Sequence, residues 1–299
     1  MSKVTIGNLI KVIDVANTLG EGVQWHALSQ CIWWTDIQES CLYCYCTQTT
    51  QLIKHDMPER VGCFAFIKDD PRIIVAFASG IALYHLQDKT IEWLDRPERH
   101  LPNNRFNDGR VDRQGRFWVG SMIENFTGGA QSSSLYLLDK HQKGISKISG
   151  IEISNGLCWS PDGSKLYHAD SPKRQINQYD FNSETGEVSN RKHFATTEYG
   201  SFPDGSAVDA QGFLWNAQWA GSRVIRYAPN GQVDTQLYLP VSQPSCVAIG
   251  GPNLDWLIIT SARQDLAVEQ LSSQPQAGNV FIYQLNGVQG IEENQCVLS

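Results

Sequence analysis

Four dipeptides in this sequence join an acid or amide side chain to a following glycine, and their oxygen atoms could bind a metal ion. They are Glu21-Gly22, Asp108-Gly109, Asn155-Gly156 and Asp204-Gly205. Carboxylate and amide oxygens suit a hard divalent cation such as calcium or magnesium, and manganese or zinc also accepts them. Each dipeptide alone is equally typical of a tight turn, because glycine and short polar residues tolerate turn conformations. The elements that carry the dipeptides decide between these interpretations.

Short apolar or aromatic runs recur along the chain at intervals of 41 to 49 residues. Their centres are Trp34, Val75, Trp118, Tyr167, Trp215 and Leu257. Each centre is followed by an alternating run that carries a tyrosine, and an earlier strand candidate precedes it. No stretch has a convincing amphipathic helical period of useful length. Each unit is therefore predicted to consist of three or four short antiparallel strands.

Six units of this length predict an all-β fold, a six-bladed β-propeller of four-stranded antiparallel blades. We expect one propeller domain over residues 1–299. The strand near residues 6–15 is expected to pair with the last unit and close the ring, because closure removes exposed strand edges. The alternative, a pair of β-sandwich domains, is disfavoured because no linker rich in proline or serine divides the chain.

The register of the repeats predicts that the four dipeptides lie together. In a propeller the first strand of each blade lines the central channel, and the residues at its start face one mouth. Each polar residue lies 10 to 13 positions before the centre of its unit, so ring symmetry brings all four toward one axis. Converging carboxylates have raised pKa values unless a cation lies among them. We therefore predict a central metal site.

Longer motifs around these dipeptides resemble a known family. They are residues 19–25 (LGEGVQW), 105–109 (RFNDG), 153–157 (ISNGL) and 203–205 (PDG), with Gly120-Ser121-Met122 followed by Glu124, and Ala169-Asp170-Ser171. Together they resemble the gluconolactonase/regucalcin (senescence marker protein) family, which includes luciferin-regenerating-enzyme-like proteins. The resemblance runs from about Ile10 to Tyr283, nearly the whole chain.

This resemblance implies a metal-dependent hydrolase that opens sugar lactones, such as aldonolactones, to the sugar acids. The family's metal ligands match Glu21, Asn155 and Asp204. Asp204 would be both a ligand and the catalytic general base. The family's substrate-contacting positions match Arg105, Asn107 and Glu124. One divalent ion is expected, calcium before zinc, manganese or magnesium, and it would activate the carbonyl and water as a Lewis acid.

The register of the repeats and the family resemblance nominate different residues at one position. Register alone nominates Asp108, whereas the resemblance favours its neighbour Asn107. Successive side chains of a strand point to opposite faces, so we expect only one of the two to face the site, and we follow the resemblance.

Other functions remain open at this stage. A non-catalytic calcium-binding or interaction propeller of the regucalcin type is the main alternative, because propellers serve many unrelated functions. A hydrolase of phosphotriesters or of a different lactone ring is a third hypothesis. Specificity is expected from loops over the channel mouth, such as residues 125–134 and 218–222. The sequence names neither the sugar, nor the physiological ion, nor the oligomeric state.

Charge and composition exclude several partners. The formal net charge is −7, and an acidic protein binds phosphate backbones poorly because that affinity comes from Lys and Arg. The sequence has no basic amphipathic stretch for a membrane surface and no export signal. We therefore expect a cytoplasmic protein that binds a small molecule, not nucleic acid or membrane.

Eight cysteines occur in the chain, and we expect them to be reduced thiols, several of them buried. Cys41 and Cys44 form a C-x-x-C motif, but no second pair or nearby histidine completes a zinc site. On a strand, Cys44 and Cys46 share one face while Cys41 takes the other. We interpret these residues as core or surface thiols.

Overall fold

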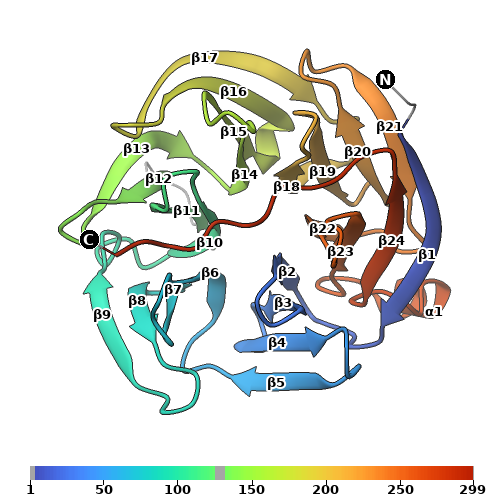
Figure 1. Cartoon of the computed structure of the whole chain (residues 1–299), viewed down its shortest axis with the longest axis horizontal. Coiled ribbons are helices and arrows are strands. Elements are labelled where there is room, and N and C mark those ends of the chain that lie inside the picture. Colours follow the sequence, from blue (N-terminus) through green and yellow to red (C-terminus); the bar gives the residue numbers. More distant parts are fainter. Residues whose placement is uncertain (1–3, 125–131, 299) are drawn as a thin grey trace.

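A computed structural model of the chain describes residues 4–124 and 132–298. In these residues, six four-stranded antiparallel sheets surround a central channel as the blades of a propeller (Figure 1). The predicted fold class and number of blades are therefore confirmed. Blades 1 and 2 consist of β2 (Gly20–His26), β3 (Cys31–Asp36), β4 (Cys41–Cys46) and β5 (Leu52–Asp56), then β6 (Val61–Phe66), β7 (Ile73–Phe77), β8 (Gly80–Tyr84) and β9 (Ile91–Asp95).

The remaining blades repeat this order from the channel outward. Blades 3 and 4 consist of β10 (Asn104–Val111), β11 (Phe117–Ile123), β12 (Ser133–Leu138) and β13 (Gly144–Ile151), then β14 (Ser154–Trp159), β15 (Lys165–Asp170), β16 (Gln175–Asn182) and β17 (Glu187–Thr196). Blades 5 and 6 consist of β18 (Phe202–Val208), β19 (Leu214–Trp219), β20 (Arg223–Tyr227) and β21 (Val233–Tyr238), then β22 (Pro244–Gly250), β23 (Trp256–Ser261), β24 (Val280–Asn286) and β1 (Thr5–Ile13).

The ring closes where the sequence predicts. The N-terminal strand β1 pairs antiparallel with β24, from Thr5 opposite Asn286 to Ile13 opposite Val280. The first and last parts of the chain thus share blade 6, and no blade is left with only three strands. Two short helices interrupt the strands, the 3-10 helix η1 (Ser171–Lys173) and α1 (Val268–Ser273). Neither they nor any other helix of the described residues is long and apolar enough to cross a membrane.

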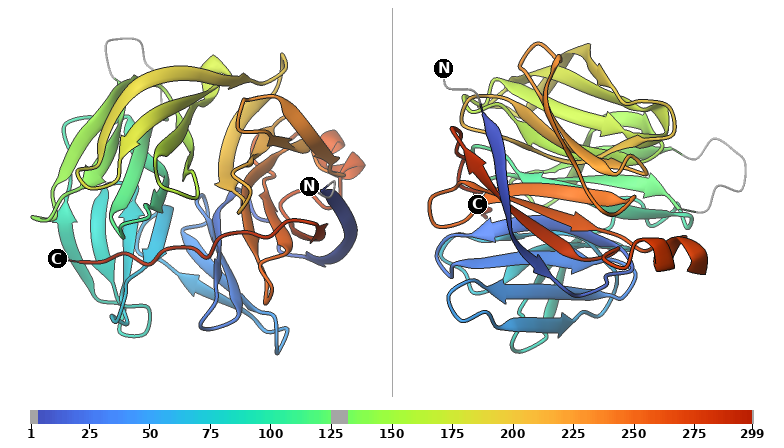
Figure 2. Two further views of the ribbon diagram at one scale, coloured as in Figure 1. Left: turned by 45° about the horizontal axis from the view of Figure 1, so that its top comes forward. Right: turned by 90° about the vertical axis from the view of Figure 1, so that its right-hand side faces the viewer.

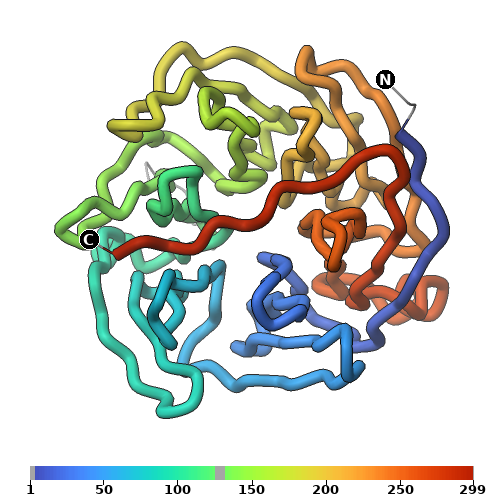
Figure 3. The backbone as a smooth tube through the Cα atoms, in the orientation of Figure 1, coloured from blue at the N-terminus to red at the C-terminus, as the bar shows by residue number. Residues whose placement is uncertain are grey.

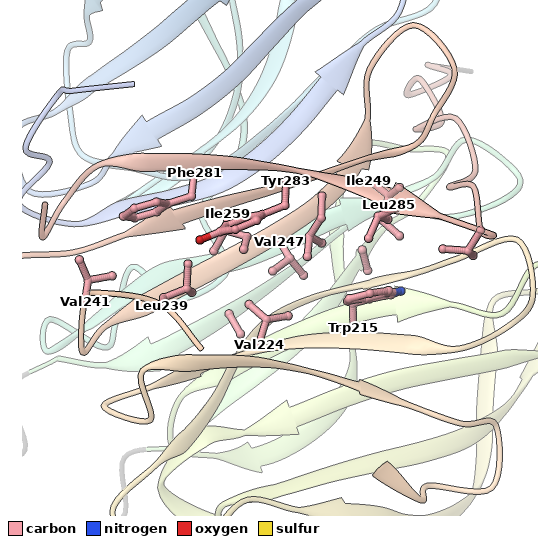
Figure 4. Packing of buried hydrophobic residues seen from close by; sticks show 14 of the residues in the cluster. Trp215, Val224, Leu239, Val241, Val247, Ile249, Ile259, Phe281, Tyr283 and Leu285 are labelled. Atoms are coloured by element: carbon pink, nitrogen blue, oxygen red, sulfur yellow. The ribbon is translucent and has the colours of Figure 1, made fainter. Parts of the chain in front are cut away.

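Large side chains fill the spaces between neighbouring blades. Between blades 5 and 6, Trp215 packs in one cluster with Ile249, Phe281 and Leu285 (Figure 4). The Trp215 indole N–H also donates a 3.0 Å hydrogen bond to Asp209 in the hairpin before it. Blade 3 repeats this contact, because the Trp118 indole N–H donates a 2.9 Å hydrogen bond to Asp112. The repeated aspartate explains why the turn signal and the tryptophan recur together.

All six innermost strands contain a register shift near their starts. Such a bulge places an extra residue in the strand and re-aims the side chains beside it. In β14 the bulge uses Gly156 at φ +64, a left-handed backbone that favours glycine. In β18 a Cβ on Gly205 would lie 2.5 Å from the Cys246 sulfur. The glycines of the dipeptides therefore let the four strands that carry them approach one axis.

The C-terminal tail, residues 287–298, is an element that the sequence analysis did not anticipate. It crosses the ring from blade 6 toward the boundary of blades 2 and 3 (Figures 2 and 3). Ala210 N donates to Gln289 O at 2.9 Å, and Val297 N donates to Gly115 O at 2.8 Å. These partners lie in hairpins at the ends of innermost strands. The tail therefore covers the channel mouth opposite the starts of those strands.

Candidate functional site

The uncovered mouth of the channel holds a cavity of about 430 Å³ at the starts of the innermost strands. Its polar lining consists of Glu21, Arg105, Asn107, Asn155, Ser171, Asp204 and Gln264. Its apolar lining consists of Leu19, Met122, Ile153, Pro172, Phe202 and Trp219. Five of the six predicted site residues thus line one cavity, contributed by four blades.

The cavity wall between blades 3 and 4 is a continuous hydrogen-bonded chain. The Arg105 guanidinium donates to Asn107 Oδ1 at 2.7 Å. Asn107 Nδ2 in turn donates to Asn155 Oδ1 at 2.9 Å, and Asn155 Nδ2 donates to Ser171 Oγ at 2.9 Å. Arg105, Asn107 and Asn155 are each less than 8% exposed. Their side chains are held in position without a ligand.

Two carboxyl groups share the opposite part of the cavity. The side chains of Glu21 and Asp204 hydrogen bond with each other. Burial raises the pKa of Glu21 to about 8, and the negative charge of Asp108 adds to the increase. Burial also raises the pKa of Asp204 well above its usual range, with further increases from Glu21 and Asp108. Removing two carboxylates from water beside a third is costly unless a positive charge compensates them.

The chemistry of these side chains fits a hard divalent cation. Asp204 Oδ1 is buried and has no hydrogen-bond partner among the described residues. The Asn155 amide oxygen keeps a second lone pair beside the bond it accepts. No group of three or more His, Cys, Asp or Glu side chains suited to a metal occurs in residues 4–124 and 132–298. Glu21, Asp204 and Asn155 together offer two carboxyl groups and one amide oxygen, a combination that suits a hard cation such as calcium better than a softer metal.

Asn107 lines the cavity, and Asp108 lies deeper in the channel. Asp108 Oδ2 accepts a 2.9 Å hydrogen bond from Leu157 N, so both side chains reach β14. Of the two residues only Asn107 lines the cavity, but the expectation that one of them would face the site assumed regular alternation. The bulge between Phe106 and Gly109 breaks that alternation. Asp108 therefore acts on the site through its charge, without lining it.

Glu124 lies behind Arg105, at the edge of the cavity. Its Oε1 accepts a 3.1 Å hydrogen bond from Arg105 Nε. Arg60 grips the same carboxylate with two hydrogen bonds, at 2.6 and 2.8 Å. The hydrogen bonds from Arg60 lower the pKa of Glu124 despite its partial burial. Glu124 is thus a bridge between two guanidinium groups, and its predicted contact with substrate stays a prediction.

The sequence analysis assigned no individual role to the apolar residues that line the cavity, to Ser171 or to Arg60. Ser171 and Met122 do lie within the quoted motifs, which was the available signal. Trp219 belongs to the expected specificity loop 218–222, whereas most of the loop 125–134 lies outside the described residues. Arg60 directly precedes the start of β6, where the sequence shows only apolar or small residues, so its side chain gave no signal.

This chain is similar in sequence to proteins of a known family. Residues 19–263 match the family description "SMP-30/Gluconolactonase/LRE-like region". L-arabinolactonase from Azospirillum brasilense is 36% identical over 281 residues, which are 93% of this chain and 92% of that protein. The 6-deoxy-6-sulfogluconolactonase from Pseudomonas putida is 34% identical, over 92% of this chain and 94% of that protein. Human regucalcin is 31% identical, over 91% and 92% respectively.

Two solved structures superpose on this chain along nearly its whole length. A luciferin-regenerating enzyme superposes with a TM-score of 0.89 at 30% identity, covering 99% of this chain and all of that one. A structure from Agrobacterium tumefaciens, described as the calcium-binding protein regucalcin, superposes with a TM-score of 0.88 at 29% identity. It covers 97% of this chain and 96% of that one.

Proposed function

Because this chain belongs to the SMP-30/gluconolactonase/LRE-like family, we propose that it is an enzyme that hydrolyses sugar lactones to sugar acids. Two relatives that align over more than nine tenths of the chain are named L-arabinolactonase and 6-deoxy-6-sulfogluconolactonase. The expected substrate is therefore a neutral or anionic aldonolactone, and the sugar itself stays open.

One observation carries this proposal. Glu21, Asn155 and Asp204 come from three blades and line the same cavity as Arg105 and Asn107. A structural ion would need only its ligands. The fixed guanidinium and amide beside them are donors that suit the oxygen atoms of a sugar lactone. We propose one divalent ion for the three ligands, calcium first, where it would supply Lewis-acid polarisation of a carbonyl oxygen.

The chain's own residues perform the remaining steps. Asp204 accepts a proton from the attacking water, and the water oxygen bonds to the lactone carbonyl carbon. The Arg105 guanidinium donates to the oxyanion that forms, and Asn107 orients a sugar hydroxyl. The acyl bond to the ring oxygen then breaks, and that oxygen takes up a proton. The product is the open hydroxy acid.

The decisive experiment is an assay of the purified protein on a panel of aldonolactones, before and after chelation. We expect ring opening, its loss with the chelator and its return with a divalent ion. Asp204→Asn should lower kcat by about a hundredfold or more, whereas Asp162→Asn, which changes a carboxylate in a remote hairpin, should leave it unchanged. Turnover that survives both chelation and Asp204→Asn would refute the proposal.

A second candidate function is favoured by one comparison. The Agrobacterium structure is described as a calcium-binding protein, so the site could hold calcium without catalysis. In that case the protein would bind calcium tightly, no lactone of the panel would open, and Arg105→Met would leave calcium affinity unchanged.

A further inference from the structure

Three cysteines gather at the end of blade 1 that lies away from the cavity. Cys31 begins β3 and Cys46 ends β4, and the two residues lie directly opposite each other. Cys44 lies two residues before Cys46, on the same face of β4. The cavity end of β3 is Asp36, which pairs with Gly20. At about 3.4 Å per residue, the cysteines lie roughly 17 Å along the blade from that end.

The backbone holds Cys31 and Cys46 in a geometry that suits a disulfide. Thr47 N donates to Gln30 O at 3.1 Å, which makes the neighbouring pair, Cys31 and Cys46, a non-hydrogen-bonded pair of the ladder. In such pairs the side chains approach most closely, with Cα atoms about 4.5 Å apart, within the range that a disulfide spans. The Cys31 thiol is within hydrogen-bonding reach of the thiols of both Cys44 and Cys46.

Cys46 differs from the other thiols in its surroundings. Its sulfur accepts hydrogen bonds from the Thr49 hydroxyl and from the backbone N–H groups of Thr49 and Gln48. These donors lower the pKa of Cys46 to about 7, with the Thr49 side chain contributing most. Cys46 is partly exposed, whereas the other seven cysteines are buried. Burial raises the pKa of Cys41 to about 11 and that of Cys158 to about 12.

We propose that Cys46 and Cys31 are an oxidisable thiol pair that reacts with hydroperoxides. The Cys46 thiolate attacks one oxygen of hydrogen peroxide and the O–O bond breaks, so that Cys46 becomes a sulfenic acid while the other oxygen takes up a proton and leaves as water. The Cys31 sulfur then attacks the Cys46 sulfur, the S–O bond breaks, and a second water carries away the oxygen. Two cysteines have lost two electrons to the peroxide, and a cross-strand disulfide has formed. A dithiol reductant reverses the change by thiol exchange.

This pair is independent of the proposed lactone chemistry. Among residues 4–124 and 132–298, no hydrogen bond or ion pair joins either cysteine to a residue that lines the cavity, and both lie in a hairpin whose strands are already paired in the reduced protein. We therefore expect oxidation to leave the fold and the metal ligands in place. Failure of the lactonase proposal would leave this inference intact, and the reverse also holds.

The test treats the full chain with hydrogen peroxide and maps the products by mass spectrometry. We expect the loss of two hydrogens per chain, a Cys31–Cys46 link, and full reversal by dithiothreitol. Cys31→Ser should instead accumulate a sulfenic acid at Cys46 that dimedone traps. Cys46→Ser should form no link at all. A link between Cys31 and Cys44, or no reaction at Cys46, would overturn the proposal.

Alkylation kinetics test the sulfur environment separately. Iodoacetamide should label Cys46 first. The pH midpoint of its labelling rate should lie near 7, below the value of about 8.5 for a free cysteine. Thr49→Val should lower the rate at pH 7 by at most about threefold, because a weaker acid has fewer thiolates but a more nucleophilic one. Thr47→Val, in the same hairpin, should leave the rate unchanged, because the Thr47 hydroxyl donates to Gln30 O at 2.9 Å and not to the Cys46 sulfur. Equal rates in all three proteins would contradict the assigned role of Thr49.

Discussion

The two mouths of the channel are built from the same six strands and differ in how their polar groups are satisfied. At the covered mouth, the tail supplies backbone partners to the hairpins, and Glu293 lies 3.6 Å from Arg110. At the open mouth, two carboxyl groups share a buried cavity and Asp204 Oδ1 has no partner in the described residues. One mouth is covered and its polar groups are paired, and the other keeps an unpartnered carboxyl oxygen that suits a ligand.

At the open mouth, Asp204→Asn is expected to have the largest effect on activity. Loss of a general base costs typically 10²- to 10⁴-fold in kcat, and steady-state kinetics on the accepted lactone measure it. Because the substitution also removes a buried carboxyl beside Glu21, the metal-free variant should melt no lower than the wild type. A variant that loses activity only because it unfolds would contradict the assignment.

His168 should make the open-mouth half of blade 4 sensitive to acid. It lies buried below the cavity, 2.8 Å from Ser154 Oγ, and burial lowers its pKa to about 4. In the unfolded chain the His168 imidazole takes up a proton near pH 6.5, whereas in the folded chain it does so only near pH 4. His168 therefore does not lower the free energy of unfolding above pH 6.5, and that free energy falls as the pH drops from 6.5 toward 4. The loss reaches about 3 kcal/mol.

Chemical denaturation at several pH values measures this effect. His168→Gln, which keeps a polar partner for Ser154, should show a flatter decline in unfolding free energy between pH 6.5 and 4. An identical pH dependence in the variant and the wild type would exclude His168 as the source.

Glu293→Gln tests the covered mouth. The substitution leaves the partly buried Arg110 without its ion-pair partner, at an expected cost of roughly 1 to 3 kcal/mol in unfolding free energy. The kcat/KM for the lactone should stay unchanged, because Glu293 lies at the opposite end of the channel. A selective loss of activity at full stability would mean that the two mouths are coupled.

The smallest effect is expected at Arg60. Arg60→Met removes the bidentate grip on Glu124 and loosens Arg105, which should lower kcat/KM by about tenfold or less. Arg72→Met is a matched control, because Arg72 pairs with Asp70 at 2.6 Å in a hairpin of the same blade. Equal effects of the two substitutions would remove Arg60 from the site.

The sequence predicted the parts of this molecule that repeat. The spacing of Trp34, Trp118 and Trp215 helped to locate the second strands, because in three of the six blades a tryptophan at this position fills equivalent space between sheets. Ring closure followed from the unpaired N-terminal strand. The tail has no counterpart in the repeats, so no recurring side-chain pattern announced it, although Val288 and Cys296 pack into hydrophobic clusters of the blades.

The candidate site was predictable only where symmetry or motif marked it. Glu21 and Asp204 share the register of the repeats, and their placement in one cavity follows from it. The positions of Asn107 and Asp108 depend on a bulge, which period-two alternation does not foresee. The grip of Arg60 on Glu124 joins residues 64 positions apart in the sequence, and it depends on side-chain geometry that only the folded structure supplies.

Calorimetric titration of calcium into the metal-free protein tests the central claim most directly, with Glu21→Gln and Asp204→Asn beside the wild type. We predict one ion per wild-type chain and an affinity lower by roughly a hundredfold or more in each variant, because each loses one anionic ligand. Binding of equal strength in all three proteins would show that these side chains do not hold the ion.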